Sequence, residues 1–366
     1  MRVKLKDITK FSKGTQINGK NLIDDGAYSY LNGGINPSGK WNEFNVAENT
    51  VTISEGGNSS GYVNYMNKAF WCGAHCYYLY DGPKNSKYLY YALKSQQERL
   101  FRIRSGACMP NIKKSDLGNF IIEYEEDETR QEEVVKVLEK CELLIEDYNK
   151  KLALLDEAVR ARFVEMFGDP IENQKNWQVV KIGDIATDVR YGTSKPAVEG
   201  GKYPYLRMNN LTVDGGLDLN NLKYIDIPDN EIEKCVVRKG DILFNRTNSI
   251  DLIGKTAVFN LLDDMVIAGY IIRIRLNNQI LPDVFSQYMN LEVMKKVLRG
   301  MAKGAVNQAN INAQELQSIK VYIPNMELQK QYVEFKEEID KSRSCIQKSL
   351  EASQELFESL MQEYFG

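Results

Sequence analysis

Residues 129–168 read TRQEEVVKVLEKCELLIEDYNKKLALLDEAVRARFVEMFG, and this stretch decides the fold. Thr129 and Glu132 predict a capping box at its start, while Gly168 and Pro170 predict its end. Between them, apolar side chains recur at alternating spacings of four and three residues, at Val134, Leu138, Cys141, Ile145, Tyr148, Leu152, Leu155 and Val159. This heptad seam predicts one long α-helix with a single buried stripe.

A second stretch of the same kind follows Pro324, with Asn325 as its expected cap. Its apolar seam is Tyr332, Phe335, Ile339, Ile346, Leu350, Leu356 and Leu360. A helix of about 40 residues is ~60 Å long, because each residue rises ~1.5 Å. Ordinary core packing is the alternative interpretation of one such seam. Two seams of this length favour packing of one helix on the other, in antiparallel order.

The two helices belong to an internal duplication of the whole chain. The sequence VKLKDI at residues 3–8 returns as VKIGDI at 180–185, and a Gly-Thr pair follows each copy, at 14–15 and 192–193. Further matches recur at an offset of 198, pairing Tyr90 with Tyr288, Leu93 with Leu291, Leu100 with Leu298, Gly106 with Gly304, Gln131 with Gln329 and Phe167 with Phe365. The sequence therefore predicts two copies of one structural unit.

Each copy begins with a mixed region of short strands and turns. Strands are expected at residues 51–54, 77–80 and 120–124, and the alternation over 270–276 predicts a strand with one apolar and one arginine-bearing face. One helix is expected near 84–104 and one near 282–300. We therefore expect an α+β fold of two pseudo-repeated mixed α/β domains joined by two long antiparallel coiled-coil helices. The predicted boundaries are 1–128, 129–168, 169–326 and 327–366.

Composition narrows the class of protein. The 366 residues carry a net charge of −3, which excludes a strongly basic nucleic-acid binder as a description of the whole chain. Residues 1–122, however, carry 16 Lys and Arg against 9 Asp and Glu, so the basic surplus is local. No apolar run reaches ~18 residues, the first residues do not read as a secretory signal, and six cysteines show no disulfide spacing. We expect a soluble cytoplasmic protein.

Motifs for catalysis are missing from the sequence. Gly254-Lys255-Thr256 resembles the end of a phosphate-binding loop, but Ser249 stands where that loop needs glycine. No glycine-rich dinucleotide motif and no Asn-Pro-Pro-Tyr or Asp-Pro-Pro-Tyr methyltransferase run occurs. Cys72, His75 and Cys76 fall short of a four-ligand zinc set, and His75 is the single histidine. We expect neither a catalytic residue nor a metal, and a buried packing role for the two cysteines.

Several stretches resemble the specificity subunit of a type I restriction–modification system. They are Tyr203-Pro204-Tyr205-Leu206-Arg207 with Asn209, Lys239-Gly240-Asp241-Ile242-Leu243-Phe244 with Arg246, Ile253-Gly254-Lys255, Phe167-Gly168-Asp169-Pro170, and the run from Asn310 through Tyr322-Ile323-Pro324. The resemblance spans essentially the whole chain and includes its duplication. One departure is the acidic run from Glu125 to Glu128, which stands where a proline would precede the first helix.

The resemblance implies a non-catalytic subunit that binds double-stranded DNA with a bipartite target. Each mixed region would be a target recognition domain for one half of that target. The long helices would set the gap between the halves and dock two modification (methyltransferase) subunits, with restriction and translocase subunits in the same assembly. The cofactor S-adenosylmethionine would belong to those methyltransferases, with none in this chain and no membrane involved. A structural coiled-coil scaffold is one alternative, and a recognition subunit of a related phage-defence DNA-modification system is another.

Polar, glycine-flanked loops supply the residues that we expect to touch DNA. The base-reading candidates are Thr15, Gln16, Asn18, Asn32, Asn58, Ser59 and Ser60 in the first copy, and Tyr191, Thr193, Ser194, Lys195, Arg207, Asn209, Arg246 and Asn248 in the second. The phosphate-binding candidates are Lys13, Arg102, Arg104, Lys113, Arg190, Lys255 and Lys303.

Overall fold

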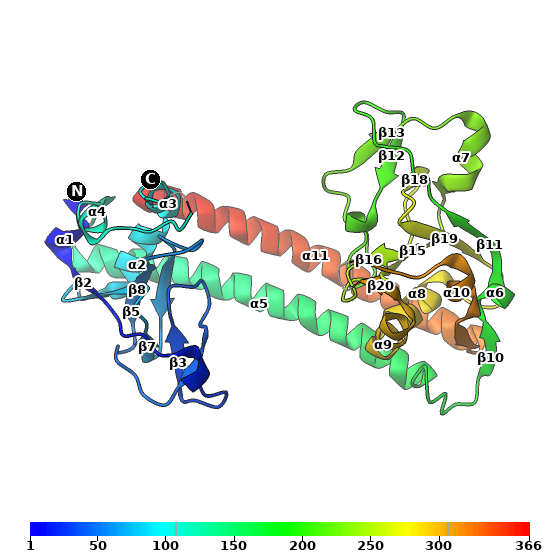
Figure 1. Ribbon diagram of the computed structural model, residues 1–366, viewed down its shortest axis with the longest axis horizontal. Helices are drawn as coiled ribbons and strands as arrows, with labels where there is room; N and C mark the ends of the chain where they lie inside the picture. The colour runs from blue at the N-terminus through cyan, green and yellow to red at the C-terminus, as the bar shows by residue number, and fades with distance from the viewer. Residues whose placement is uncertain (107, 306–307) are drawn as a thin grey trace. The chain divides into compact units, whose positions relative to one another are not determined.

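A computed structural model describes residues 1–106, 108–305 and 308–366. The chain forms two compact units, here called unit 1 (Met1–Asn149 with Lys348–Gly366) and unit 2 (Lys150–Gln347). Two 40-residue helices, α5 (Glu128–Phe167) and α11 (Met326–Phe365), each contribute one half to either unit (Figure 1). Figure 1 marks both chain ends within unit 1.

Unit 1 combines short strands with short helices. Its strands are β1 (Arg2–Lys4), β2 (Lys10–Lys13), β3 (Tyr28–Leu31), β4 (Gly39–Trp41), β5 (Thr50–Ser54), β6 (Val63–Met66), β7 (Phe70–Cys72), β8 (Cys76–Tyr80) and β9 (Ile121–Glu123). Its shorter helices are α1 (Leu5–Ile8), η1 (Gly19–Asn21), α2 (Ser86–Lys94), α3 (Gln97–Arg102) and α4 (Lys114–Gly118). The strands form sheets in the orders β2-β8-β5-β6, β4-β3-β7 and β1-β9.

Unit 2 is built from the same kinds of element. Its strands are β10 (Gln178–Lys181), β11 (Ala186–Tyr191), β12 (Tyr203–Leu206), β13 (Lys223–Ile225), β14 (Val236–Val237), β15 (Ile242–Asn245), β16 (Thr247–Asn248), β17 (Thr256–Val258), β18 (Met265–Ile267), β19 (Ile271–Leu276), β20 (Lys303–Ala305), β21 (Gln308–Asn310) and β22 (Lys320–Ile323). Its shorter helices are α6 (Ile182–Ile185), η2 (Met208–Asn210), α7 (Asp229–Cys235), α8 (Pro282–Asn290), α9 (Glu292–Met301) and α10 (Ala313–Ser318).

The two units share one strand topology, which confirms the predicted duplication. The order β11-β19-β15-β17 repeats β2-β8-β5-β6, the order β13-β12-β18 repeats β4-β3-β7, and β10-β22 repeats β1-β9. The parallel strand pairing also recurs, as β3 with β7 and β12 with β18. Unit 2 has the additional elements α7 and β14. Where Asn111 of unit 1 forms only isolated bridges with Gly56 and Ser105, unit 2 has the three-stranded sheet β16-β21-β20. The expected α+β fold of two repeated domains with long helices is confirmed.

In unit 1, the start of α5 packs beside the end of α11. Val134 and Leu138 share a buried cluster with Met361 and Phe365. The Phe365 ring lies 5.2 Å from the ring of Tyr88 on α2, measured between centroids. Because opposite ends of the two helices meet here, they run antiparallel.

In unit 2, the end of α5 packs beside the start of α11. The ring of Phe163 lies 5.4 Å from that of Tyr332, and both side chains are fully buried. Asp156 of α5 and Arg343 of α11 form an ion pair at 2.5 Å. The predicted antiparallel order therefore holds in both units.

Three local predictions about the helices are wrong. Helix α5 begins at Glu128 with Asp127 accepting a hydrogen bond from the Thr129 amide, so Thr129 is no cap. Leu356 is 52% exposed and lies off the seam, where Phe357 packs into the unit 1 core instead. The single helices expected near 84–104 and 282–300 are each two helices, α2 with α3 and α8 with α9. The other seam residues are buried or half-buried, and Asn325 caps α11 through the Glu327 amide.

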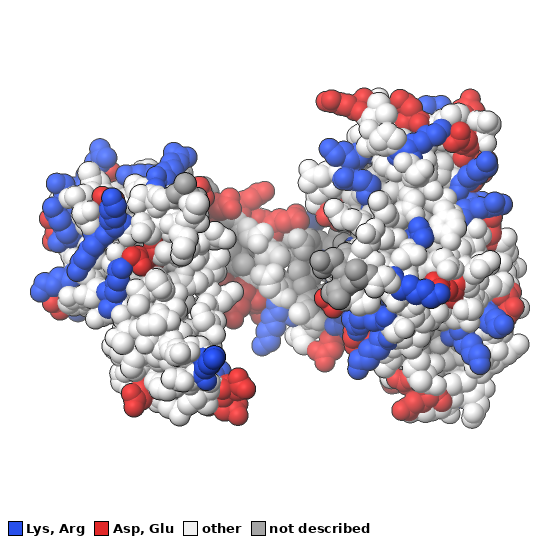
Figure 2. Space-filling view, viewed as in Figure 1, with Lys and Arg blue, Asp and Glu red and all other residues white. Residues whose placement is uncertain are grey.

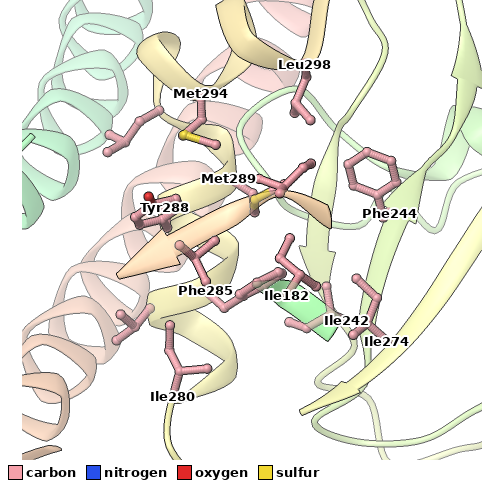
Figure 3. Close-up of a cluster of buried hydrophobic side chains, with 14 of the residues drawn as sticks. Ile182, Ile242, Phe244, Ile274, Ile280, Phe285, Tyr288, Met289, Met294 and Leu298 are labelled. Atoms are coloured by element: carbon pink, nitrogen blue, oxygen red, sulfur yellow. The ribbon is translucent and has the colours of Figure 1, made fainter. Parts of the chain in front are cut away.

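The largest core of unit 2 lies between its central sheet and helices α8 and α9. Figure 3 shows Phe285, Met289 and Leu298 from these helices near Phe244 and Ile274 from the sheet. The β-branched and aromatic residues of β15 and β19 suit such a packed surface.

The arginine-bearing face of β19 does not lie open to solvent. Arg273 is 1% exposed and is paired with Asp188, while Arg275 is paired with Asp241 at 2.9 Å. Burial alone would raise the pKa of Asp188, but hydrogen bonds from Arg273 and Arg190 outweigh it and lower that pKa. Arg273 is therefore part of the core, and both arginines are already paired with carboxylates of the same unit.

One buried lysine makes the stability of unit 2 depend on pH. The Nζ of Lys295 donates hydrogen bonds to the Gly254 carbonyl at 2.6 Å and to Asn290 at 2.7 Å, where unit 1 has Gln97 bonded to the Gly61 carbonyl. Burial lowers the pKa of Lys295 to about 7. Between that pH and the ordinary lysine value, the unfolded chain holds a proton that the folded chain lacks. Stability from this group therefore rises with pH across that window.

Lys295→Gln, which copies the residue of unit 1, should remove this dependence. Urea unfolding of both proteins at pH 7 and 9 is the measurement. The free energy of unfolding of the wild type should gain on that of the variant by up to about 1.4 kcal/mol per pH unit. Lys296→Gln, at the exposed neighbouring position, is the control. It keeps Lys295, so its free energy of unfolding should change with pH as that of the wild type does. A Lys295→Gln difference independent of pH would contradict the prediction.

Candidate nucleic-acid interface

A hollow of about 480 Å³ lies in unit 2 where several loops leave the ends of strands. The loops follow β11, β12 and β15, and the turn between β18 and β19 closes the ring. Six of the residues predicted to read bases line this one hollow, namely Thr193, Ser194, Lys195, Arg207, Asn209 and Arg246. The fold thus gathers side chains that are up to 53 positions apart in the sequence.

Arg246 is held in place by an aromatic side chain. Its guanidinium carbon lies 4.9 Å from the centroid of the Tyr191 ring, and its Nη1 donates to the Gly269 carbonyl at 3.4 Å. Its Nε is buried and has no hydrogen-bond partner among the described residues. A stacked guanidinium with unused donors is suited to bind a planar acceptor pair such as the O6 and N7 atoms of guanine.

Arg207 is a second guanidinium with a buried, unpartnered Nε in the described part of the chain. Its Nη2 donates to the carbonyl of Asn221 at 3.2 Å. Arg207 directly follows β12, and Asn32 holds the matching place directly after β3 in unit 1. Two residues chosen from the sequence alone therefore occupy equivalent positions.

The Gly-Thr pair forms the same corner in both units. The amide of Thr15 donates to the Cys72 carbonyl at 2.8 Å, and the amide of Thr193 donates to the Ile267 carbonyl at 2.9 Å. A Cβ at Gly14 would lie 1.9 Å from the Cys72 oxygen, and one at Gly192 would lie 2.2 Å from the Ile267 oxygen. Only glycine permits this approach, which places the following threonine at the rim.

Unit 1 has its own hollow, of about 560 Å³, lined by Ser12, Lys13, Glu55, Tyr77, Asn111, Ile112, Lys113 and Lys114. The side chain of Glu55 is 14% exposed and lies 2.5 Å from the Lys13 ammonium and 3.5 Å from the His75 Nδ1. Lys13 therefore pairs with this carboxylate, and Lys113 and Lys114 line the same hollow. Glu55 is not among the residues predicted from the sequence, because an acidic side chain is not an obvious partner for DNA.

Unit 1 carries six exposed lysines near its first strands, three of which line this hollow, and we call the six the lysine patch. They occupy the elements β1, α1, β2 and the start of α4, and they are Lys4, Lys6, Lys10, Lys13, Lys113 and Lys114. Figure 2 shows Lys and Arg side chains gathered over this part of unit 1. Such a patch is typical of a phosphate-binding surface.

The remaining unit 1 candidates divide into exposed and structural residues. Thr15, Gln16, Asn18, Asn58 and Arg102 are exposed, although Asn18 also caps η1. Ser60 is fully buried and donates to the Glu55 carbonyl at 2.7 Å, so it supports the loop instead of facing a ligand. Ser59 is bonded to the Gly33 carbonyl, and Arg104 is bonded to the Phe101 and Asn58 carbonyls.

In unit 2, the structure argues against the phosphate role predicted for Lys255. This side chain is 7% exposed, and its Nζ donates to the carbonyls of Met208 and Leu211. Lys303 is highly exposed and paired with Glu315, and Arg190 is exposed and paired with Asp188. Asn248 is half-buried and bonded to Asn245.

Cys72 and Cys76 occupy packing positions. Strand pairing matches them to Ile267 and Ile271 of unit 2, where a metal ligand is impossible. A hydrogen bond to Cys76 and burial both raise the pKa of the Cys72 thiol, which disfavours a metal-binding thiolate. Within residues 1–106, 108–305 and 308–366, no group of three or more His, Cys, Asp or Glu is placed to hold a metal. None of the helices described there is long and apolar enough to cross a membrane.

Comparison with known sequences gives consistent matches. The family model of the type I restriction modification DNA specificity domain matches residues 1–156 and 174–353. A relative from Mycoplasma genitalium that carries the name of a type I specificity subunit is 30% identical over 252 residues, covering 59% of this chain and 64% of the relative. The specificity subunit of the type I restriction enzyme EcoKI from Escherichia coli is 21% identical over 238 residues, covering 64% of this chain and 49% of the relative. The matched regions thus span about half to two thirds of these relatives.

Solved structures share the fold. The S subunit of a type I restriction-modification system from M. genitalium has a TM-score of 0.67 at 20% identity, with 100% of this chain and 96% of that chain covered. A chain from a study of complex assembly and conformational transition of the type I R-M system has a TM-score of 0.51 at 14% identity, with 99% and 96% covered. With the family model matching both repeats, the chain belongs to the type I restriction modification DNA specificity family.

Proposed function

We propose that this chain is the DNA-specificity subunit of a type I restriction–modification complex and recognises a bipartite target. The observation that carries the proposal is the pair of hollows. One strand framework is repeated twice, and each copy has a hollow lined by the residue that directly follows its central strand, Glu55 after β5 or Arg246 after β15. The rest of each lining comes from different segments, so the two hollows carry different polar side chains. A constant framework with variable polar residues is what reading two different half-sites requires.

The long helices offer surfaces for partner proteins. On α5, Val137, Leu143 and Leu144 are exposed in unit 1, and Leu154 and Val164 are exposed in unit 2. Exposed apolar side chains that come together in a patch mark protein interaction sites, and we take these residues of α5 as candidates for such contacts. We assign these surfaces to two methyltransferase subunits, which would bring S-adenosylmethionine and the adenine chemistry. Restriction and translocase subunits would join the same assembly, and this chain would have no active site of its own.

Arg246→Ala tests the hollow of unit 2. The variant should lose discrimination at one base pair of one half-site by ~1–3 kcal/mol, because the bidentate donor is gone. Binding selection from random duplexes by the assembled complex is the measurement. An unchanged target would show that Arg246 reads no base.

Lys303→Ala is the contrasting variant in the same unit. Loss of an exposed cation should weaken all sequences alike and reduce the salt slope of binding by ~1. A sequence-selective loss would contradict the phosphate role of Lys303. A complex whose DNA affinity does not depend on salt would favour a coiled-coil scaffold over the proposed function.

A further inference from the structure

Glu55 in unit 1 stands at the position that Arg246 holds in unit 2. Each directly follows a central strand, β5 or β15. The Glu55 amide donates to the His75 carbonyl and its carbonyl accepts from the Ile112 amide. The Arg246 amide donates to the Tyr270 carbonyl and its carbonyl accepts from the Ile311 amide. The two backbones are therefore equivalent at this point, and only the side chains differ.

The residue that contacts Glu55 or Arg246 also differs between the units. Strand pairing matches Lys13 at the end of β2 to Tyr191 at the end of β11. In unit 1 the cation of Lys13 holds the Glu55 carboxylate, while in unit 2 the ring of Tyr191 holds the Arg246 guanidinium. Each unit thus positions a charged side chain at the equivalent point of the framework, where it lines a hollow, and the charge is negative in unit 1 and positive in unit 2.

We propose that Glu55 is a specificity-determining residue of unit 1 that accepts a hydrogen bond from the exocyclic amino group of a cytosine or an adenine. The inference rests on the proposed function. An ionised carboxylate only accepts hydrogen bonds, and in the major groove the donors are the N4 amino group of cytosine and the N6 amino group of adenine. Guanine and thymine present the acceptors O6 and O4, which would face the carboxylate unpaired.

The lysines around Glu55 allow a negatively charged side chain to lie close to negatively charged DNA. Lys13 touches it directly, and Lys113 and Lys114 line the same hollow. The other lysines of the patch are exposed cations, which is the kind of group that contacts DNA phosphates. Each carboxylate oxygen has more than one lone pair, so an ion pair with Lys13 leaves capacity to accept from a base. If the role of Glu55 were purely structural, its carboxylate would contact only Lys13 and His75 and would not contact a base.

The test is binding selection from random duplexes by the complex of this chain with its methyltransferase subunits. Glu55→Gln should relax one position of one half-site by about 10- to 100-fold, because an amide also donates and no longer rejects guanine or thymine. Glu55→Arg should shift that position toward guanine. Asp81→Asn is the matched control, since Asp81 is an exposed carboxylate of unit 1 paired with Lys10, and its target should stay unchanged.

A second measurement separates base reading from folding. The wild-type complex is offered duplexes in which single cytosines are replaced by 2-pyrimidinone and single adenines by purine, so that one amino group is missing. One substitution in one half-site should weaken wild-type binding about 10- to 100-fold and weaken the Glu55→Gln complex less, because a neutral amide oxygen is a weaker acceptor than a carboxylate. If Glu55→Gln does not assemble, Glu55→Asp takes its place. It keeps the negative charge but carries the carboxylate one methylene further from the base, so it should also be less sensitive than the wild type to loss of the amino group.

The outcomes distinguish this inference from the proposed function. A wild-type complex that selects no sequence overturns both. A wild-type complex that selects a two-part target, with the same target for Glu55→Gln and Glu55→Arg, overturns the role of Glu55 alone. Equal weakening of every sequence by Glu55→Gln also overturns it, because a structural ion pair predicts that result.

Discussion

Replacing Phe163 with alanine is expected to lower the free energy of unfolding of unit 2 by about 3–5 kcal/mol. Its ring is fully buried where the end of α5 meets the start of α11. The ring centroids of Phe167 and Tyr332 lie 4.9 Å and 5.4 Å away, and that of Tyr288 lies 6.4 Å away. Truncation would leave a large cavity between three aromatic side chains, so the cost combines lost burial with lost packing.

Calorimetric unfolding of the whole chain measures this effect. Val164→Ala is the control on the next residue of α5, because its side chain is 43% exposed and its truncation should cost well under 1 kcal/mol. If both variants unfold alike, the helix pair contributes little to the stability of unit 2 and the packing role given to Phe163 is wrong.

Gly192→Ala is expected to destabilise unit 2 by roughly 2–4 kcal/mol and to disturb the adjoining hollow. The added Cβ would lie 2.2 Å from the Ile267 oxygen and 2.3 Å from the Ala268 oxygen. Both atoms are backbone atoms, the first at the end of β18 and the second in the turn that follows, so this part of the backbone must shift. Arg246 is bonded to the Gly269 carbonyl in that turn and would move with it.

Thermal unfolding and DNA binding of the assembled complex together test this prediction. Gly300→Ala is the control, since Gly300 lies in α9 and a Cβ added there would meet no heavy atom within 4 Å. That variant should gain up to ~1 kcal/mol of helix stability. A Gly192→Ala protein as stable as the wild type, with an unchanged target, would show that the Gly-Thr corner does not position the hollow.

Much of the fold could be predicted because its signals are periodic or repeated. The heptad seam identified α5 as one long helix, and every seam residue from Val134 to Val159 is buried or half-buried. The polar start and Gly168 placed its ends within one residue of the observed bounds, although Thr129 itself is not the cap. The seam of α11 failed at Leu356 because serines interrupt it, and spacing alone does not show that Phe357 takes the inward position. Helix breaks such as Leu291 depend on tertiary contacts, so the sequence did not show them.

The candidate site was harder to predict, because it depends on pairing between distant strands. Loop residues such as Thr193 and Arg207 could be chosen for their polar, glycine-flanked surroundings, and they do line one hollow. The sequence does not show which polar loop residues are buried. Ser60 and Lys255 therefore stand among the candidates, although their polar atoms donate to backbone carbonyls. Glu55 was missed because its equivalence to Arg246 is visible only in the strand register.

The most direct test of the central claim is to map methylated adenine across the source genome with this gene present and with it deleted. We expect a two-part motif to be methylated when the gene is present and unmethylated when it is deleted. Exchange of the two recognition regions between the helices should then reorder that motif. If the complex is expressed and active and no two-part motif changes on deletion, this chain is not the reader of a bipartite DNA target.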